Sequence, residues 1–368
     1  MSKQTTIFIT GATGLIGSYL LKMLLANGDK VYALARSNDN KSARQRVTDT
    51  VDFWDKKITP KHANNLIVLE GDITQDDLGL GKRDKETLIN NAEEIFHCAA
   101  VTQFNWTIDD IRKQNVTGTQ NILELAVECQ MNGNFRKVNH LSTAYICGDY
   151  KGVFREDDLD VGQGFQTTYV QSKFEAEKLV LEYRNKGLWI DIYRPPLVVG
   201  ESATGKTFTF QQSVYQLFHI WNLGIFDHFP GKGLLVNIIF VDELCNAIFR
   251  IASLSSSENK NYHPFSSEAV PLELILDMSN KFLEFRKPEL ISRENFLKNN
   301  PTPAQKMLLQ NNILLFNDYV RLDSKTTEKV LEQYGFEFSK MNKDYLLKVL
   351  EYCTEAGFLK KHHEKVPH

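Results

Sequence analysis

The sequence predicts an α/β protein built on a doubly wound, mostly parallel sheet of the Rossmann type, with a smaller and mainly helical C-terminal lobe. Short apolar runs rich in β-branched residues alternate with longer helical patterns through the first half of the chain. Strands that are apolar on both faces belong to parallel sheets covered by helices on both sides. Right-handed crossovers between such strands produce a doubly wound sheet.

The elements follow from these patterns in order along the chain. A strand is predicted at 6–9 because four β-branched or aromatic residues follow one another there. A helix is predicted at 15–26, where apolar residues recur at helical spacing. The same two patterns predict further strands at 31–34, 66–69, 95–97, 138–141 and 188–192, and helices at about 109–130 and 169–183.

The pattern changes after Gly200. An aromatic-rich segment is followed by a returning strand at 237–240 and a helix that runs to about Ile251, and the rest is mostly helical. We therefore assign residues 1–200, joined by 236–255, to the Rossmann domain. Residues 201–235 and 256–368 form a lobe over the carboxyl ends of the strands, where α/β sheets bind their ligands.

Composition excludes several classes of protein. The 368 residues are 42% hydrophobic and 24% charged, as in globular proteins. A net charge of −3 offers no basis for nucleic-acid binding. Apolar stretches stay far below the ~20 residues of a membrane span, and the N-terminus leaves no room for a signal peptide. Five cysteines without a CxxC pair indicate reduced thiols. We expect a cytoplasmic protein without a transmembrane segment.

A glycine-rich turn joins the first strand to the first helix. Gly11 permits the tight turn, Gly14 lets the backbone approach a pyrophosphate, and Gly17 allows close packing of helix and strand. The helix N-terminus adds free N–H groups and partial positive charge. Placement between a strand and a helix favours a dinucleotide site over an ordinary loop. Its predicted residues are Thr10, Gly11, Thr13, Gly14, Leu15, Ile16 and Gly17.

The end of the second strand indicates which dinucleotide binds. An NAD site has a carboxylate there for the ribose hydroxyls, but this chain has Arg36 and no acid. Arg36, with Arg46 on the next helix, can pair with the adenosine phosphate of NADPH. The alternative is that both are solvated surface arginines. The absence of an acid and the presence of Arg36 both favour a phosphate on the adenosine ribose, so we predict NADPH.

Two later strand ends complete the predicted nucleotide site. Asp72 can accept the adenine amino group while Ile73 covers the ring, although a simple turn explains Asp72 equally well. Ala99 and Ala100 are small, as a backbone that passes under a ribose requires. The histidines lack metal-ligand spacing, so we predict no metal site and interpret His97 and His140 as core residues.

A threonine, a tyrosine and a lysine form the predicted catalytic set. Thr143 ends the fifth strand, and Tyr169 and Lys173 lie four residues apart on one face of the next helix. A free tyrosine, with a pKa near 10, is a poor acid at pH 7. A neighbouring ammonium is expected to draw that pKa towards neutrality. The Thr143 hydroxyl is placed to hold the oxygen of a carbonyl group whose carbon receives hydride.

With these residues the chain resembles the extended short-chain dehydrogenase/reductases. That family has the same glycine turn and the same Ser/Thr–Tyr–Lys set, and Asn115 matches its motif asparagine. Within that family the chain is similar to the thioester reductase and fatty acyl-CoA reductase branch, with its NAD-binding domain of the male sterility type. The resemblance is strong over residues 1–250. It rests on the segments 96–100, 141–145, 169–177 and 194–202, and continues at 204–205, 229–231 and 241–242.

The resemblance implies an NADPH-dependent reductase that transfers hydride to an acyl-thioester carbonyl, giving an aldehyde and, after a second reduction, an alcohol. It implies that Thr143 and Tyr169 hold the oxyanion, that Tyr169 donates the proton, and that Lys173 holds the nicotinamide ribose. In the family, the residue matching Asn115 supports the proton relay to the lysine. The backbone at Pro196, Leu197 and Val198 would fix the nicotinamide ring.

Two other reactions stay open at this point. A ketone, aldehyde or alcohol oxidoreductase uses the same set of residues and differs only in the lobe. A nucleotide-sugar epimerase or dehydratase needs a retained NAD, against which Arg36 argues. A non-catalytic binding module is expected to lack Tyr169 or Lys173, and both are present.

The lobe is expected to bind the substrate, an acyl thioester of CoA or of an acyl or peptidyl carrier protein. Most aromatic residues at 208–229 are predicted to form its core, and a minority to line an apolar tunnel. For the apolar segment at 300–317, packing is the default. A lid helix, a dimer surface and a peripheral membrane contact are its alternatives. Monomer and homodimer both stay open.

Overall fold

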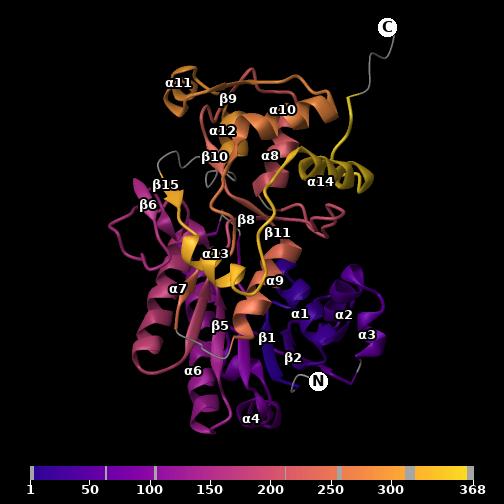
Figure 1. Ribbon diagram of the computed structural model, residues 1–368, viewed down its shortest axis with the longest axis vertical. Helices are drawn as coiled ribbons and strands as arrows, with labels where there is room; N and C mark the ends of the chain where they lie inside the picture. The colour runs from indigo at the N-terminus through magenta and orange to yellow at the C-terminus, as the bar shows by residue number, and fades with distance from the viewer. Residues whose placement is uncertain are drawn as a thin grey trace.

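A computed structural model describes residues 4–62, 64–102, 106–211, 213–254, 259–310 and 320–362. Figure 1 shows a sheet flanked by helices in the lower part of the molecule and a mainly helical part above it. The seven strands are all parallel and lie in the order β12-β7-β5-β4-β1-β2-β3. The winding reverses between β1 and β4, which is the switch point where such sheets bind ligands. The predicted α/β fold is confirmed.

The predicted strands and helices of the Rossmann part agree with the structure to within a few residues. The strands of the sheet are β1 Thr6–Thr10, β2 Lys30–Ala35, β3 Leu66–Glu70, β4 Glu94–His97, β5 Lys137–Leu141, β7 Ile190–Tyr193 and β12 Asn261–Tyr262. Its helices are α1 Leu15–Asn27, α2 Ala43–Trp54, α3 Ile58–Lys61, α4 Lys82–Asn91, α5 Ile108–Arg112, α6 Gly118–Met131, α7 Thr168–Asn185 and α9 Val241–Ala252.

Helices cover both faces of the sheet, which explains why its strands are apolar throughout. On one face α1 packs between α2 and α9 around one apolar core. On the other, α6 packs between α4 and α7 around a second. A π-helical turn, Lys113–Thr117, joins α5 to α6. The N-termini of these helices and the carboxyl ends of the strands therefore lie on the same side of the molecule, below the upper lobe (Figure 1).

The upper lobe has its own core, built mainly from aromatic and aliphatic side chains of α8, α10 and α14. As predicted, most of the aromatic residues at 208–229 belong to this core, and Phe218 and Phe229 have no exposed surface. The lobe contains α8 Ser213–Asn222, β9 His228–Pro230, β10 Leu235–Val236, β13 Val270–Pro271, α10 Leu272–Leu283, β14 Glu289–Ile291, α11 Arg293–Lys298, α12 Pro303–Gln310 and α14 Lys343–Glu355.

Two segments lie elsewhere than the sequence suggests. The strand predicted at 237–240 is β11, Ile238–Phe240, which pairs with β8, Leu197–Val199, outside the central sheet. Only the following helix, α9, returns to the Rossmann part, where it packs on α1. Conversely β12, which the sequence places in the lobe segment 256–368, extends the central sheet beside β7. Only two of its residues pair there, too few to show an apolar strand pattern.

Two further contacts of the C-terminal segment are made below the lobe. β15, Val320–Leu322, pairs in parallel with β6, Gly152–Phe154, which precedes α7. The helix α13, Lys325–Glu332, packs against α9. Residues 320–332 therefore lie beside the Rossmann part rather than in the upper lobe.

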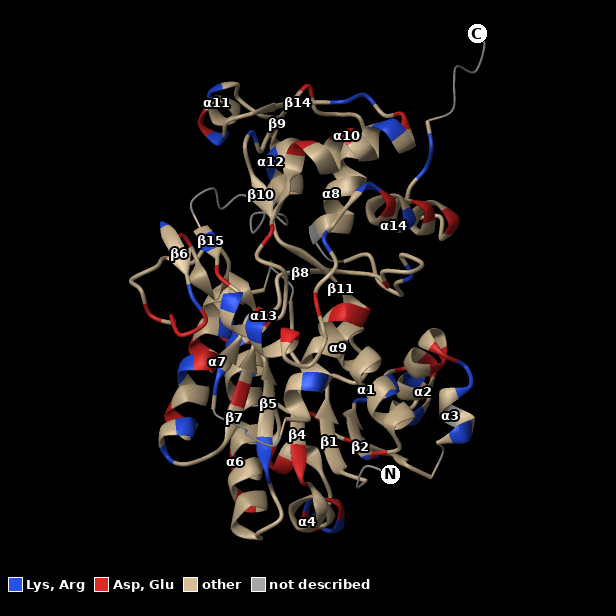
Figure 2. Ribbon diagram, in the orientation of Figure 1, with Lys and Arg blue, Asp and Glu red and all other residues tan. Residues whose placement is uncertain are grey.

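The surface and the apolar segments do not point to a membrane span. Figure 2 shows basic and acidic residues interspersed on α2, α7, α11 and α14. Within the described ranges, no helix has both the length and the apolar character needed to cross a bilayer. Of the 300–317 segment, Leu308 and Leu309 pack against the lobe core, while Met307 is 63% exposed. The apolar run at 313–316 lies outside the described residues.

Candidate active site

The glycine turn lies against the end of β4. Gly11 has a φ of +71°, and a Cβ atom there would lie 2.6 Å from the Ala99 nitrogen. A Cβ at Gly17 would lie 2.2 Å from the Gly11 carbonyl oxygen. Gly14 is the N-cap of α1, no side chain caps the helix, and its first turn holds no acid. The free N–H groups of α1 are therefore left for a ligand, as the sequence predicts for an anion.

Two cavities adjoin across this turn. The larger, about 420 Å³, reaches from the turn to β5, α7 and the segment after β7. The smaller, about 210 Å³, reaches to the ends of β2 and β3. Gly11, Thr13, Gly14, Cys98 and Ala100 line both of them. Together they form an elongated site at the switch point of the sheet.

The structure brings every predicted site residue except Asn115 to the wall of one or both cavities. The larger cavity is lined by Gly11, Thr13, Gly14, Leu15, Ile16, Gly17, Ala100, Thr143, Tyr169, Lys173, Pro196, Leu197 and Val198. The smaller is lined by Thr10, Gly11, Thr13, Gly14, Arg36, Arg46, Asp72, Ile73, Ala99 and Ala100.

The two arginines lie together in the wall of the smaller cavity. Arg46 donates a hydrogen bond to the Arg36 carbonyl oxygen, and Arg36 lies 3.3 Å from a carboxylate oxygen of Asp72. Burial favours a raised pKa for Asp72, but bonds from Thr74 and the charge of Arg36 hold the pKa below its ordinary value. The Arg36 side chain is 56% exposed, so its guanidinium remains accessible to a ligand phosphate.

Thr143, Tyr169 and Lys173 converge on one wall of the larger cavity. Thr167 caps α7 by accepting a hydrogen bond from the Val170 nitrogen, which starts the helix just before Tyr169. The Thr143 side chain lies close enough to the Tyr169 phenol to favour a lower pKa of that phenol. The Lys173 ammonium donates to the carbonyl oxygen of Leu141 at 2.8 Å. A phenol, a hydroxyl and an ammonium thus meet where a carbonyl group can lie between them.

The protonation states differ from the expectation drawn from the sequence. Burial raises the pKa of Tyr169 to about 12, and the nearby Thr143 hydroxyl offsets only part of that effect. Burial also lowers the pKa of Lys173 to about 8, against the opposing charge of Glu177. The loss of hydration on burial is thus the largest influence on the pKa of both groups. Tyr169 keeps its proton at neutral pH, as a proton donor must.

Asn115 lies in the π-helical turn and is 1% exposed. Its amide nitrogen donates to the carbonyl oxygen of Val101 at 3.0 Å and to the Ser172 hydroxyl at 2.9 Å. Its amide oxygen accepts from the Val101 nitrogen at 2.8 Å. The side chain thus ties the segment after β4 to α7 next to Lys173. Its part in a proton relay stays a prediction.

The two strand-end histidines are buried, as predicted. His97 bonds to Thr10 at 2.8 Å and to Thr119 at 3.0 Å. The Thr119 hydroxyl donates to the Asn115 carbonyl oxygen, so it accepts from the Nε2–H of His97. Burial, with the charge of Lys173, lowers the pKa of His97 to about 3 and also lowers that of His140. In the described part of the chain, no cluster suited to a metal ion occurs.

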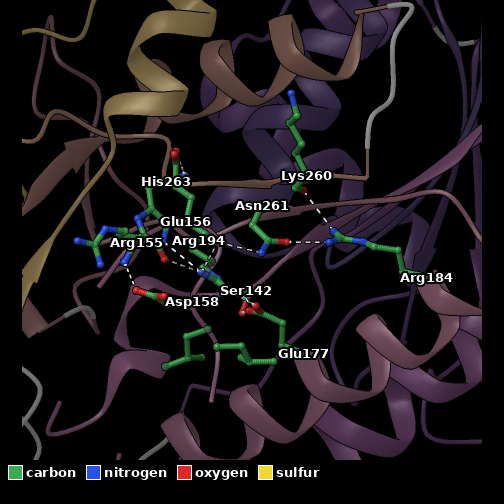
Figure 3. A network of polar contacts seen from close by, with 12 residues as sticks. Ser142, Arg155, Glu156, Asp158, Glu177, Arg184, Arg194, Lys260, Asn261 and His263 are labelled. Atoms are coloured by element: carbon green, nitrogen blue, oxygen red, sulfur yellow. Dashed lines mark hydrogen bonds and ion pairs between the residues drawn. The ribbon is translucent and has the colours of Figure 1, made fainter. Parts of the chain in front are cut away.

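The sequence reasoning missed a buried ion pair beside the catalytic set. Glu177 on α7 and Arg194 after β7 are both 0% exposed and lie 2.5 Å apart (Figure 3). Glu177 also accepts a hydrogen bond from Ser142, the residue before Thr143, at 2.5 Å. The helical spacing did contain a sign of this arrangement: Glu177 follows Lys173 by four residues and therefore shares its inward face.

The site fits a nicotinamide dinucleotide on three structural grounds. The Gly11–Gly17 turn leaves the α1 N-terminus free for a pyrophosphate. The smaller cavity offers Arg36 and Arg46 to an adenosine phosphate, and the larger one offers Lys173 to a ribose. Each end of the site thus carries cationic side chains that could hold part of a dinucleotide.

Comparisons with known proteins agree with this geometry. A model of the family described as male sterility protein matches residues 9–248. A component of the linear gramicidin synthase of Brevibacillus parabrevis is 26% identical over 385 residues, covering 98% of this chain and 7% of that protein. Fatty acyl-CoA reductase 1 of Xenopus laevis is 36% identical over 212 residues, covering 55% of this chain and 38% of that protein. The chain spans less than two thirds of the length of these relatives.

A solved structure is similar over both parts of the molecule. The terminal R domain from the myxalamid PKS-NRPS biosynthetic pathway superposes with a TM-score of 0.81 at 25% identity. The alignment covers 98% of this chain and 93% of that one, so the likeness includes the upper lobe.

Proposed function

Because this chain belongs to the male sterility protein family of extended short-chain dehydrogenase/reductases, we propose that it reduces an acyl thioester with NADPH and releases a free thiol, with an aldehyde or, after a second reduction, an alcohol as the product. The convergence of Thr143, Tyr169 and Lys173 on the larger cavity carries the proposal. Similarity to a fatty acyl-CoA reductase and to a terminal domain of a PKS-NRPS pathway supports a thioester substrate, bound to CoA or to a carrier protein.

The chain's own residues would hold the cofactor and the reacting carbonyl. Bound NADPH supplies hydride. Lys173 would bind the nicotinamide ribose, and the backbone at 196–198 would orient the ring. Thr143 and Tyr169 would donate hydrogen bonds to the carbonyl oxygen, where negative charge grows as the carbon is reduced. The buried phenol of Tyr169, which keeps its proton at neutral pH, would then protonate that oxygen.

Arg36 and Arg46 favour NADPH over NADH in this proposal. Replacing Arg36 with alanine is expected to weaken NADPH binding by about 10- to 100-fold, the value of a charge-assisted hydrogen bond, and to leave NADH binding nearly unchanged. Fluorescence titration with both cofactors measures the effect. Arg44→Ala is the control, since Arg44 is exposed on α2, the helix that carries Arg46, but does not line the cavity. Equal losses for NADPH and NADH would contradict the role of Arg36.

The proposal also predicts how activity depends on pH. Lys173 has a pKa of about 8, so its ammonium loses its proton above that pH, while Tyr169, with a pKa of about 12, stays protonated. We expect kcat/KM for reduction to fall above pH 8 by about tenfold per pH unit, as loss of a single proton dictates. A profile from pH 6 to 10 measures this. A rate that stays level to pH 9.5 would exclude Lys173 as the titrating group.

The direct test follows both halves of the reaction. The purified chain is incubated with NADPH and an acyl-CoA, and both cofactor oxidation and thiol release are recorded. We expect thiol release to match the first hydride transferred, with an aldehyde or alcohol as product. Turnover of ketones or of nucleotide sugars without thiol release would replace this proposal with one of the two alternative reactions.

A further inference from the structure

We propose that Glu177, held by Arg194, is a positioning residue that aligns the catalytic set and maintains the charge of Lys173. The inference rests on the proposed function, because it concerns the same site. Glu177 lines neither cavity. Its effect must therefore pass through the residues that it binds.

The two carboxylate oxygens of Glu177 bind two different elements. Oε2 accepts the hydrogen bond from the Ser142 hydroxyl at 2.5 Å. Oε1 accepts from the Arg194 Nε at 2.9 Å and from its Nη2 at 2.5 Å. One side chain on α7 thus links the end of β5 to the end of β7, as Figure 3 shows. The three elements that it joins are those that carry the catalytic set and the segment at 196–198.

Each partner of Glu177 stands next to a residue of the site. Ser142 precedes Thr143, and Arg194 precedes Pro195. The carbonyl oxygen of Pro195 accepts a hydrogen bond from the Ala144 nitrogen at 2.9 Å and lies 3.4 Å from the Thr143 hydroxyl. A displacement of Glu177 would therefore move the Thr143 hydroxyl relative to the phenol of Tyr169.

Arg194 is in turn anchored on the far side. Its remaining amino group donates to the Glu156 carbonyl oxygen at 2.9 Å. The Glu156 carboxylate accepts hydrogen bonds from the backbone nitrogen of His263 at 3.2 Å and from the backbone nitrogen of Thr327 at 2.9 Å. These contacts connect the ion pair to the end of β12 and to α13. The guanidinium thus has few other positions available, and it holds Glu177 in place.

The charge of Glu177 also acts on Lys173. The two side chains lie one turn apart on the same face of α7. His97, His140 and Cys98 face Lys173 from β4, β5 and the segment after β4, and the pKa values of His97 and His140 lie far below neutrality. Arg194 and Arg184 face Glu177 from the other side. Without the carboxylate, the buried Lys173 ammonium would lose the negative charge that opposes the effect of its burial, which favours its neutral form.

Three substitutions separate charge from position. Glu177→Gln keeps the shape and removes the charge, so we expect kcat to fall. We also expect the alkaline limit, which is the pH above which activity falls because Lys173 loses its proton, to move down by about one pH unit. Glu177→Asp keeps the charge but shortens the side chain by one methylene. It is expected to retain the wild-type limit with a lowered kcat. Glu175→Gln is the matched control, because Glu175 lies on the same helix and pairs with Arg112 at the partly exposed outer face. It should change neither quantity.

The alkaline limit set by Lys173 is measured in two ways. One is the pH profile of kcat with NADPH and an acyl-CoA. The other is the affinity for NADPH from pH 6 to 10 without substrate, which tests Lys173 even if the wild-type chain reduces no thioester. An unchanged limit in Glu177→Gln, or an equal shift in Glu175→Gln, would overturn the inference. Failure of the wild-type chain to release thiol would overturn the proposed function instead.

A further variant applies if Glu177→Gln does not fold, since it leaves a buried guanidinium without its partner. Ser142→Ala removes only the hydroxyl that binds Glu177 and leaves the ion pair intact. We expect it to lower kcat by about tenfold, as loss of a charge-assisted hydrogen bond allows, with the alkaline limit unchanged. A kcat equal to that of the wild type would show that alignment through Ser142 does not occur.

Discussion

Replacing Tyr169 with phenylalanine is expected to reduce turnover by about 10²- to 10⁴-fold, the usual contribution of a positioned general acid, while NADPH binds almost as before. The ring would keep its place, because Tyr169 is 9% exposed and packs with Ile111 and Val170. The Thr143 hydroxyl would keep the Pro195 carbonyl oxygen as a partner. Only the proton donor would be lost.

The measurement compares kcat with the NADPH dissociation constant in the same preparation. Tyr183→Phe is the control, since Tyr183 lies on the same helix and lines neither of the two cavities that hold the site. It should keep wild-type turnover. If Tyr169→Phe lost cofactor affinity in proportion to kcat, the residue would be part of the binding site and not the acid.

Replacing Gly11 with alanine is expected to abolish cofactor binding, with a loss of affinity above about 100-fold, because the pyrophosphate needs the close approach that only glycine permits here. A Cβ would lie 2.6 Å from the backbone of Cys98 and Ala99, where no side-chain movement can relieve the contact. The turn must therefore move away from β4. This displacement changes the shape of the glycine turn, which lines both cavities.

Gly28→Ala separates this contact from backbone strain. Gly28 has a φ of +90°, but a Cβ there would have no atom of the described residues within 4 Å. Both variants thus cost about 1 kcal/mol for a left-handed backbone, and only Gly11→Ala has the clash. We expect Gly28→Ala to lower Tm slightly and to bind NADPH normally.

Gly14→Ala tests pyrophosphate binding at the same turn if Gly11→Ala does not fold. A Cβ at Gly14 meets only the Gly11 carbonyl oxygen, at 3.3 Å, so the variant should fold with a narrowed approach to the α1 N-terminus. NADPH affinity in Gly14→Ala equal to that of the wild type would contradict a pyrophosphate at this turn.

Local pattern was sufficient for most of the Rossmann part. The first strand was predictable from its unbroken run of β-branched and aromatic residues, and α1 was predictable from apolar residues at helical spacing. Their junction at Gly11 was predictable because a turn that needs a positive φ selects glycine. The two-residue strand β12 was not predictable, since its position depends on its neighbour β7 and its length is too short for any period.

The sequence by itself determined the α/β class, the glycine turn and the placement of Tyr169 and Lys173 on one helix face, because these depend on spacing along a single strand, turn or helix. Only the tertiary structure decided the protonation of Tyr169 and Lys173 and the link through Glu177 and Arg194. A pKa depends on how much water the fold removes and on which charges it brings together from distant segments. Glu177 and Arg194 are 17 residues apart, and no local pattern pairs them.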